Sequence, residues 1–592
     1  MDLGRDEAVG LFRQTPLFAG LPEAAVAQLA AGATLRRVRA GEWLFRQGDA
    51  GEHIYVVVSG RLEAIVESSR PDQVVRVHGR GELIGELAFI TGWARSASVR
   101  ARRDAELLEI PYTGFRDLVR RHTDVAVEIL HVLARRLATG TVTPAGSVPR
   151  TVAVVDLRER EAVPVIGSLA DAFGDRVATV SRADRRPAAE PGRLVDELER
   201  THDTVVLATA VADPADWLNF CRRQADRVLC VADVTDRPQP AGLALLAGCD
   251  LALTGQPSGR TASWLDALRP RAHHWLDLPN REAGVARLVR RLLGRSTGVV
   301  FSGGGARCFA HIGVLERLRE RGITVDRIGG CSMGAFVAAL VAMGLSAREM
   351  VDICREEFVR RNPFNDYTLP RVSVIRARKA AALMDRVFGA TGIENCALDY
   401  FCVSSDLVSA DLVVHRRGQL ARAVEASMSI PGFAPPVEAD GRLLVDGGVL
   451  DNLPVGVMTA AGEGPVLAVD VMGRTRLGQP GTRPTLVETL ARATVLGSWQ
   501  RLAATRAGPA RHHARRPGDR PARLPPARRS RRGRSPGRRD RGGSGAALEL
   551  EIPRTCSPCR ARQTHTSIIS PRRSARVTSV SRWSTVPPKT LV

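Results

Sequence analysis

A serine in a short segment flanked by glycines is the residue of this chain best suited to nucleophilic chemistry. The segment Gly330-Cys331-Ser332-Met333-Gly334 follows an apolar, strand-like run and precedes a helical one. A G-x-S-x-G turn between a strand and a helix holds its serine in a strained conformation, with the hydroxyl exposed at the carboxyl edge of a sheet. We therefore predict that Ser332 is the nucleophile of a serine hydrolase.

A glycine-rich loop upstream offers donors for a developing negative charge. The strand-like run Val299-Val300-Phe301 leads into Ser302-Gly303-Gly304-Gly305-Ala306-Arg307, and a helical pattern follows. Bare backbone amides beside a helix N-terminus suit an oxyanion as well as a phosphate. A nucleotide-binding P-loop would carry a lysine, and none follows here. We expect the amides of Gly303, Gly304, Gly305 and Ala306 to form an oxyanion hole. The alternative is an ordinary tight turn.

A carboxylate at the end of a third apolar run supplies a base. The run Leu443-Leu444-Val445 ends on Asp446-Gly447-Gly448, which alone would be an ordinary turn. His415 lies among charged residues, and His311 lies in the helix after the glycine loop, where packing or capping is expected. We therefore predict a dyad of Ser332 and Asp446, without a metal or a catalytic cofactor. An aspartate with a pKa near ~3.9 is a weak base, so the oxyanion donors must supply much of the catalysis.

These three motifs, in this order, resemble those of the patatin-like phospholipases. The resemblance covers about residues 296–500 and includes the small-residue stretch that runs from Ala423 to Phe433. One difference is Cys308, which stands where the family's loop usually has its last glycine and which could crowd the start of the helix. The resemblance implies an α/β catalytic domain and a carboxylic ester hydrolase that takes phospholipid or lysophospholipid as substrate.

The N-terminal part contains a second pair of residues suited to binding. Strand-like runs punctuated by glycines over residues 45–60 predict a β-barrel or jelly roll. Further on, Glu86 could accept a hydrogen bond from a ribose hydroxyl and Arg95 could hold a cyclic phosphate. Residues 12–138 resemble the cyclic-nucleotide-binding domain of catabolite activators and regulatory kinase subunits. This implies cAMP or cGMP as a regulatory ligand, held by Gly85, Glu86, Leu87, Arg95 and Ser96; the alternative is a domain without ligand, in which Glu86 and Arg95 form a plain ion pair.

The segment between these two regions, residues 150–295, alternates apolar strand-like and helical runs. This pattern predicts a parallel, Rossmann-like α/β unit. The expected strands are Thr151 to Val155, Thr204 to Ala208, Arg227 to Ala232 and Leu251 to Thr254. We assign no site to it and expect a spacer or dimerisation unit, although the sequence does not indicate an oligomeric state. The order of the three regions is similar to that of bacterial relatives of neuropathy target esterase.

The net charge of +22 comes almost entirely from the end of the chain. Residues 501–592 contain 23 Arg and Lys against 4 Asp and Glu, so the first 500 residues carry only +3. No helix-turn-helix pattern follows residue 138, which argues against a transcription factor or another specific nucleic-acid-binding protein. The Arg/Pro-rich tail predicts disorder, with two further hypotheses: a polybasic segment that binds anionic lipid or nucleic acid, and a shifted reading frame.

The sequence also bears on location. The first residues resemble no signal peptide, and no uncharged apolar run reaches the roughly 18 residues of a membrane span. Eight of the ten cysteines are scattered singly, which fits reduced thiols. We predict a cytoplasmic ester hydrolase in peripheral contact with the inner face of the membrane. The alternative is a catalytically inactive scaffold that responds to cyclic nucleotide.

Overall fold

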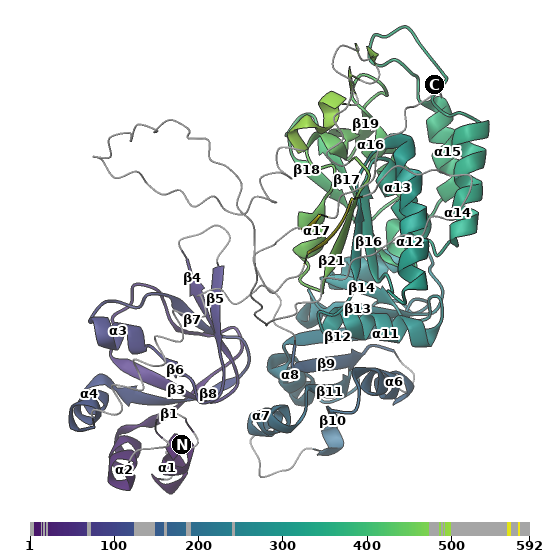
Figure 1. The fold of residues 1–592 in the computed structure, drawn as a ribbon. Helices are drawn as coiled ribbons and strands as arrows, with labels where there is room; N and C mark the ends of the chain where they lie inside the picture. The colour runs from purple at the N-terminus through teal and green to yellow at the C-terminus, as the bar shows by residue number, and fades with distance from the viewer. Residues whose placement is uncertain are drawn as a thin grey trace, which may run out of the picture.

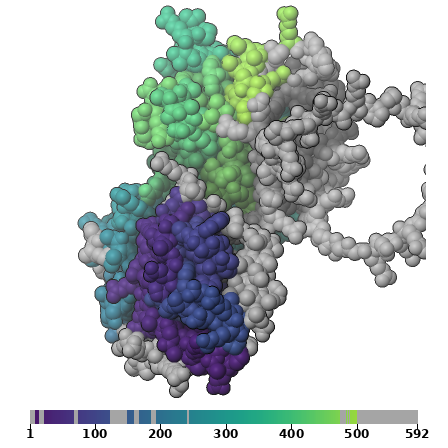
Figure 2. All heavy atoms as spheres, turned by 90° about the vertical axis from the view of Figure 1, so that its left-hand side faces the viewer, coloured from purple at the N-terminus to yellow at the C-terminus, as the bar shows by residue number. Residues whose placement is uncertain are grey.

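The computed structural model describes residues 5–498, with gaps of which 123–148 and 473–482 are the longest, and residues 565–569 and 578–579. Figure 1 shows three sheet-based units in chain order, and Figure 2 shows the purple and blue N-terminal unit below the green C-terminal one. This arrangement confirms the predicted fold class. The apolar stretch from Ile129 to Leu133, whose pattern predicts part of a helix that closes the N-terminal region, lies outside the described residues, and so does most of the basic tail.

The N-terminal unit is the predicted jelly roll. Two four-stranded antiparallel sheets, β1-β8-β3-β6 and β2-β7-β4-β5, share a core that includes Val57 and Leu62. Edge-to-face contacts of Phe18 with Phe12 and Phe115 pack the helices against the first sheet. The elements are α1 (Arg5–Arg13), α2 (Glu23–Gly32), β1 (Thr34–Val38), β2 (Trp43–Phe45), β3 (His53–Ser59), β4 (Leu62–Val66), β5 (Gln73–His78), β6 (Leu83–Ile84), α3 (Glu86–Thr91), β7 (Ser98–Ala101), β8 (Ala105–Pro111) and α4 (Tyr112–Arg121).

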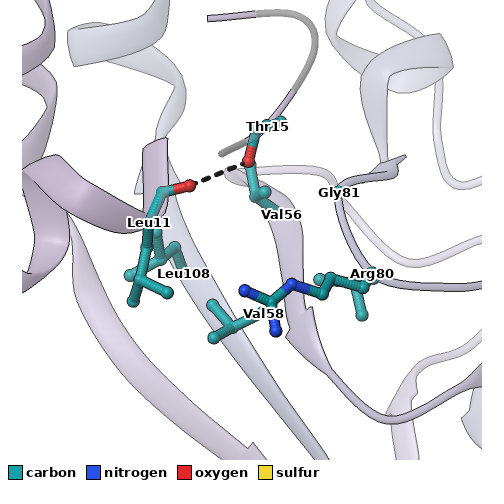
Figure 3. Close-up of a pocket in the computed structure, with 8 residues that line it drawn as sticks. Leu11, Thr15, Val56, Val58, Arg80, Gly81 and Leu108 are labelled. Carbon is teal, nitrogen blue, oxygen red and sulfur yellow. Dashed lines mark hydrogen bonds between the residues drawn. The ribbon is translucent and has the colours of Figure 1, made fainter. Parts of the chain in front are cut away.

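A small pocket lies between α1 and the first sheet of this unit (Figure 3). Thr15 closes one side, and its Oγ1 donates a hydrogen bond to the carbonyl oxygen of Leu11 (3.2 Å). The walls are mainly aliphatic and consist of Leu11, Thr15, Val56, Val57, Val58, Arg80, Gly81 and Leu108. None of the residues predicted to bind a cyclic nucleotide lines this pocket.

The central unit is a six-stranded parallel sheet in the order β10-β11-β9-β12-β13-β14. Its inner strands are buried on both faces, as continuous apolar runs require. All four predicted strands are present, as β9, β11, β12 and β13. The elements are β9 (Thr151–Asp156), α6 (Val163–Phe173), β10 (Val177–Val180), η1 (Arg182–Asp184), α7 (Pro191–Thr201), β11 (Thr204–Ala210), α8 (Ala215–Gln224), β12 (Arg227–Asp233), η2 (Ala244–Leu246), β13 (Asp250–Thr254), α10 (Thr261–Leu268), β14 (Ala272–Trp275) and α11 (Arg281–Leu292).

The C-terminal unit is built on a mixed sheet in the order β19-β20-β17-β16-β15-β21-β22-β23, with β18 paired to β17. Helix α13 is buried along its whole length, which fits its uninterrupted apolar sequence. Strands β22 and β23 belong to the tail for which the sequence predicts disorder, and they pair at the edge of this sheet.

The elements of the C-terminal unit are β15 (Gly298–Phe301), η3 (Gly305–Phe309), α12 (Ala310–Glu320), β16 (Arg327–Cys331), α13 (Met333–Ala342), α14 (Ala347–Cys354), η4 (Arg355–Arg360), α15 (Arg378–Phe388), η5 (Ile393–Asn395), β17 (Asp399–Asp406), β18 (Leu412–His415), α16 (Leu420–Met428), β19 (Val437–Ala439), β20 (Arg442–Asp446), η6 (Gly447–Val449), α17 (Val455–Thr459), β21 (Val466–Asp470), β22 (His565–Ile569) and β23 (Thr578–Ser579).

Ion pairs with buried carboxylate side chains join the three units. Arg103 of the N-terminal unit has no exposed surface and donates to Glu199 (2.8 Å) and Asp226 (3.1 Å) of the central unit. On the other side, Arg271 and Arg291 donate to Glu463 of the C-terminal unit (3.1 and 2.7 Å). Glu463 lies where β15 and β21 begin, so the central unit covers the amino edge of the C-terminal sheet.

Candidate active site

Ser332 lies between the end of β16 and the start of α13, with φ 54° and ψ −132°. This backbone conformation is costly for a residue with a side chain, and it persists only where the surroundings enforce it. A Cβ on Gly334 would lie 2.3 Å from the carbonyl oxygen of Ser302, and a Cβ on Gly330 would lie 2.8 Å from the backbone of Gly334. The two flanking glycines are therefore required by the close approach of the chain on either side of the serine.

Asp446 lies within hydrogen-bond distance of the serine, as the sequence predicts. The Oγ of Ser332 donates to Oδ2 of Asp446 (2.7 Å), and the amide of Gly448 donates to Oδ1 (2.8 Å). Helix α16 and the residue after it position both Ser332 and Asp446 through hydrogen bonds to their backbone amides. Ser427 Oγ accepts from the amide of Ser332 (2.9 Å), and the carbonyl oxygen of Ser429 accepts from the amide of Asp446 (2.8 Å).

The environment changes the acid-base chemistry of Asp446 from that expected for a free aspartate. Burial raises the pKa of Asp446 to about 6, although the hydrogen bonds from Ser332 and Gly448 oppose the shift. Its side chain is a better proton acceptor than the sequence alone indicates, since basicity rises with the pKa. The expectation of a weak base is therefore corrected by the burial of this carboxylate.

Three backbone amides of the predicted oxyanion hole donate no hydrogen bond to any residue that the structure describes. The first bond of η3 runs from the amide of Arg307 to Gly304, so within the described chain no acceptor faces the amides of Gly304, Gly305 and Ala306. Gly303 differs from the expectation, because its amide donates to the carbonyl oxygen of Asn452 (3.2 Å).

Asn452 also holds the same glycine with its side chain. Its Nδ2 donates to the carbonyl oxygen of Gly303 (3.2 Å), so a loop that follows Asp446 clamps the oxyanion loop from two directions. A Cβ on Gly303 would lie 2.5 Å from Oδ1 of Asn452 and 2.9 Å from Cβ of Ser332. Sequence reasoning missed this residue, because an asparagine near a turn is common and carries no signal of its own.

Cys308 and the two histidines take structural places. Cys308 is buried without crowding the loop, and its thiol donates to the carbonyl oxygen of Ser302 (3.4 Å). His311 donates from Nε2 to the same oxygen (3.1 Å) and stacks on Phe301, and burial lowers the pKa of His311 to about 4. His415 bonds to Ser404. Neither histidine contacts Ser332.

The residues predicted to bind a cyclic nucleotide surround α3. Arg95 is 5% exposed and donates to the carbonyl oxygens of His53 (2.8 Å) and Gly85 (3.3 Å) and to Tyr112 (3.2 Å). Glu86 is buried at the start of α3, whereas Leu87 and Ser96 are exposed. Among the described residues, the side-chain hydrogen bonds of Arg95 go to backbone carbonyl oxygens and the Tyr112 hydroxyl, and the plain ion pair with Glu86 stays an alternative.

No group of three or more His, Cys, Asp or Glu side chains among the described residues could hold a metal ion. No helix found there has the length and apolar character needed to cross a bilayer.

The buried carboxylate of Asp446 makes a prediction about stability. Raising its pKa from 3.8 to about 6 means that ionisation of the folded protein costs about 3 kcal/mol, present above pH 6 and absent below pH 4. Asp446→Asn keeps the shape and removes the charge, so we expect it to raise the free energy of unfolding at pH 8 by about 1 to 3 kcal/mol. Urea unfolding at several pH values measures this gain, which should shrink toward pH 4; a loss of stability at pH 8 would contradict it.

Comparison with known proteins places this geometry in a family. The patatin-like phospholipase family matches residues 299–459, and the cyclic nucleotide-binding domain family matches residues 35–122. An uncharacterised NTE family protein of Mycobacterium tuberculosis is 33% identical over 479 residues, which cover 79% of this chain and 81% of the relative. Patatin-like phospholipase domain-containing protein 6 of Homo sapiens is 30% identical and a lysophospholipase of Mycosarcoma maydis is 29% identical; the matches cover 73 and 74% of this chain but 37 and 28% of those longer proteins. The chain therefore belongs to the NTE family, and it is an ester hydrolase of the patatin-like phospholipase type.

Proposed function

We propose that this protein hydrolyses the acyl esters of phospholipids or lysophospholipids with Ser332 as nucleophile and Asp446 as general base. The observation that supports the proposal most directly is the 2.7 Å hydrogen bond from the serine hydroxyl to a buried carboxylate with a pKa of about 6. A base with this pKa is ionised at neutral pH and lies near enough to take the proton directly.

In the proposed reaction, Asp446 accepts the proton of Ser332 as the serine oxygen attacks the acyl carbonyl carbon. The amides of Gly304, Gly305 and Ala306 donate to the oxyanion, and the amide of Met333 at the start of α13 is a further donor. When the tetrahedral intermediate collapses, Asp446 returns the proton to the leaving alcohol. A water molecule then attacks the acyl-serine and Asp446 accepts its proton. When this second intermediate collapses, the bond to the Ser332 oxygen breaks, Asp446 returns the proton to that oxygen, and the fatty acid leaves.

The lipid substrate rests on the relatives. One of them is a lysophospholipase and another is a patatin-like phospholipase domain-containing protein. A fluorophosphonate probe tests the role of the serine, because a protein in which Ser332 is not activated leaves this residue unlabelled.

The dyad makes a prediction about activity and its pH dependence. We expect Ser332→Ala and Asp446→Asn each to lower kcat for a p-nitrophenyl ester about 10³-fold or more, because each removes a group that acts in the reaction. In the wild type, kcat/KM should rise with pH through about 6 and then level off, because only the ionised carboxylate accepts a proton.

The matched control for this experiment is His311→Ala, since His311 packs against Phe301 and does not reach the serine. We expect this variant to keep most of the activity. Full loss in a folded His311→Ala protein would point to a triad instead of a dyad.

Asn452 is expected to act as a positioning residue for the oxyanion loop. Asn452→Asp is nearly isosteric but lacks the donor to the carbonyl oxygen of Gly303, so we expect kcat to fall about 10- to 100-fold with little change in KM. Asn219→Ala in α8 of the central unit is the control. An unchanged kcat in the Asn452→Asp protein, with its unfolding midpoint preserved, would remove this role from Asn452.

We also propose that the N-terminal unit binds a cyclic nucleotide and that binding changes hydrolysis. The support is the family match and the position of a buried guanidinium, Arg95, next to Gly85 at the start of α3. The phosphate would replace the carbonyl oxygens of His53 and Gly85 as partner of Arg95. Arg95 also donates to Tyr112 of α4. A change in the partners of Arg95 would therefore change the contacts of α4, the last described helix of this unit.

Titration of the protein with cAMP and cGMP tests the regulatory proposal. We expect binding to the wild type and at least about a 10-fold weaker affinity for Arg95→Lys, which keeps the charge but cannot make a bidentate contact. Arg116→Ala, on the exposed face of α4, is the control and should bind like the wild type. Identical flat responses of the wild type and Arg95→Lys to both nucleotides would eliminate the ligand.

A further inference from the structure

The connection between α14 and α15 exposes an unusual amount of apolar surface. We call residues 359–378 the arm. Its large apolar side chains Val359, Tyr367, Leu369 and Val372 are 68, 63, 74 and 70% exposed. Side chains of this size in a soluble domain are normally buried, and a group of them in one segment marks a surface that meets another apolar phase.

The charge of the arm indicates which kind of partner this surface binds. Arg360 and Arg361 are paired with Glu356, but Arg371, Arg376 and Arg378 are exposed and make no ion pair with any described residue. One acidic residue, Asp366, lies in the arm, and it accepts from the backbone of Lys379. Apolar side chains flanked by unpaired guanidinium groups complement an anionic lipid surface, where the headgroups attract the cations and the side chains enter the interface.

The arm packs directly against the loop that precedes Asp446. The amides of Val374 and Ile375 donate to the carbonyl oxygens of Gly432 and Phe433 (both 3.0 Å). The rings of Phe364 and Phe433 lie 6.1 Å apart. This loop continues from Ser429, whose carbonyl oxygen holds the amide of Asp446. A partner that binds the arm therefore lies close to the residues that surround Ser332 and Asp446.

A second exposed apolar tip lies at the same edge of the sheet. Strand β17 runs parallel to β16, with Val403 opposite Cys331, so the turn after β17 extends beyond the position of Ser332. Leu407 and Val408 in that turn are 51 and 77% exposed. In Figure 1 the arm loops over the end of the C-terminal unit that faces away from the central unit.

We propose that the arm, together with the Leu407–Val408 turn, docks the protein on an anionic lipid bilayer and presents the carboxyl edge of the C-terminal sheet to it. This inference rests on the proposed lipid ester hydrolysis, because it explains how a substrate held in a bilayer reaches Ser332. In this orientation the central and N-terminal units, which lie at the amino edge, remain on the water side.

The test measures co-sedimentation with vesicles in a Ser332→Ala background, so that binding is scored without turnover. We expect the full-length parent to bind vesicles of roughly one part phosphatidylglycerol to two parts phosphatidylcholine, more weakly in high salt and more weakly still to phosphatidylcholine alone. Leu369→Glu with Val372→Glu, and separately Arg371→Glu with Arg376→Glu, should each lower the partition coefficient at least about 10-fold. The matched controls are Leu245→Glu in the central unit and Arg319→Glu on α12, both at exposed positions, and they should bind like the parent.

Several results would overturn the proposal. Parent-like binding by the arm variants, or no binding by the parent, removes the arm as a docking surface. Self-association in analytical ultracentrifugation that the arm variants abolish would assign the arm to contacts between copies of this chain. Unfolding midpoints close to that of the parent show that the variants are folded. Failure of the protein with its native serine to hydrolyse a soluble ester would count against the catalytic proposal and leave the binding result unaffected.

Discussion

The close approach of two backbone segments, the glycine loop after β15 and the serine turn after β16, is the constraint on which the rest of this site depends. A side chain at Gly334 would collide with the carbonyl oxygen of Ser302, and one at Gly303 would collide with Ser332 itself. Only residues without a Cβ allow the amides and the hydroxyl to face the same small volume. Parallel pairing of β15 with β16 then fixes the distance between the two turns.

The carboxylate is held by different means. Asp446 ends β20, which is antiparallel to β17, and its neighbours are the thiol of Cys331 and the amide of Gly448 rather than water. An ionised group in this place is unfavourable by about 3 kcal/mol, and the same burial gives it the basicity that proton transfer needs. In the proposed reaction this locally unfavourable group is the base, and the fully apolar α13 and the strands beside it supply the surrounding stability.

The motifs that depend on the backbone were readable in the sequence, because glycine is the residue that tight turns and close contacts require. The serine turn and the glycine loop belong to this class, whereas the four strands of the central unit were readable from their continuous apolar runs. Strand β14, with the sequence Ala-His-His-Trp, has no strand pattern of its own and is extended because it pairs with β13. The clamp by Asn452, the engaged amide of Gly303 and the basicity of Asp446 depend on contacts between distant segments, and no local pattern encodes them.

The ion pairs at the two junctions between units decide whether one unit can be produced without the others. The motifs mark three regions that read as separate modules, yet Arg103 would lose both of its carboxylate partners if the chain were cut after the first region. Glu463 would likewise be left without Arg271 and Arg291 if the last region were produced alone. A unit produced alone would expose to water the surface that surrounds these charges, so the ion pairs and the burial of that surface would be lost together. The regions are separable in the sequence, but in the folded molecule the neighbouring unit supplies the partners of charged side chains at each junction.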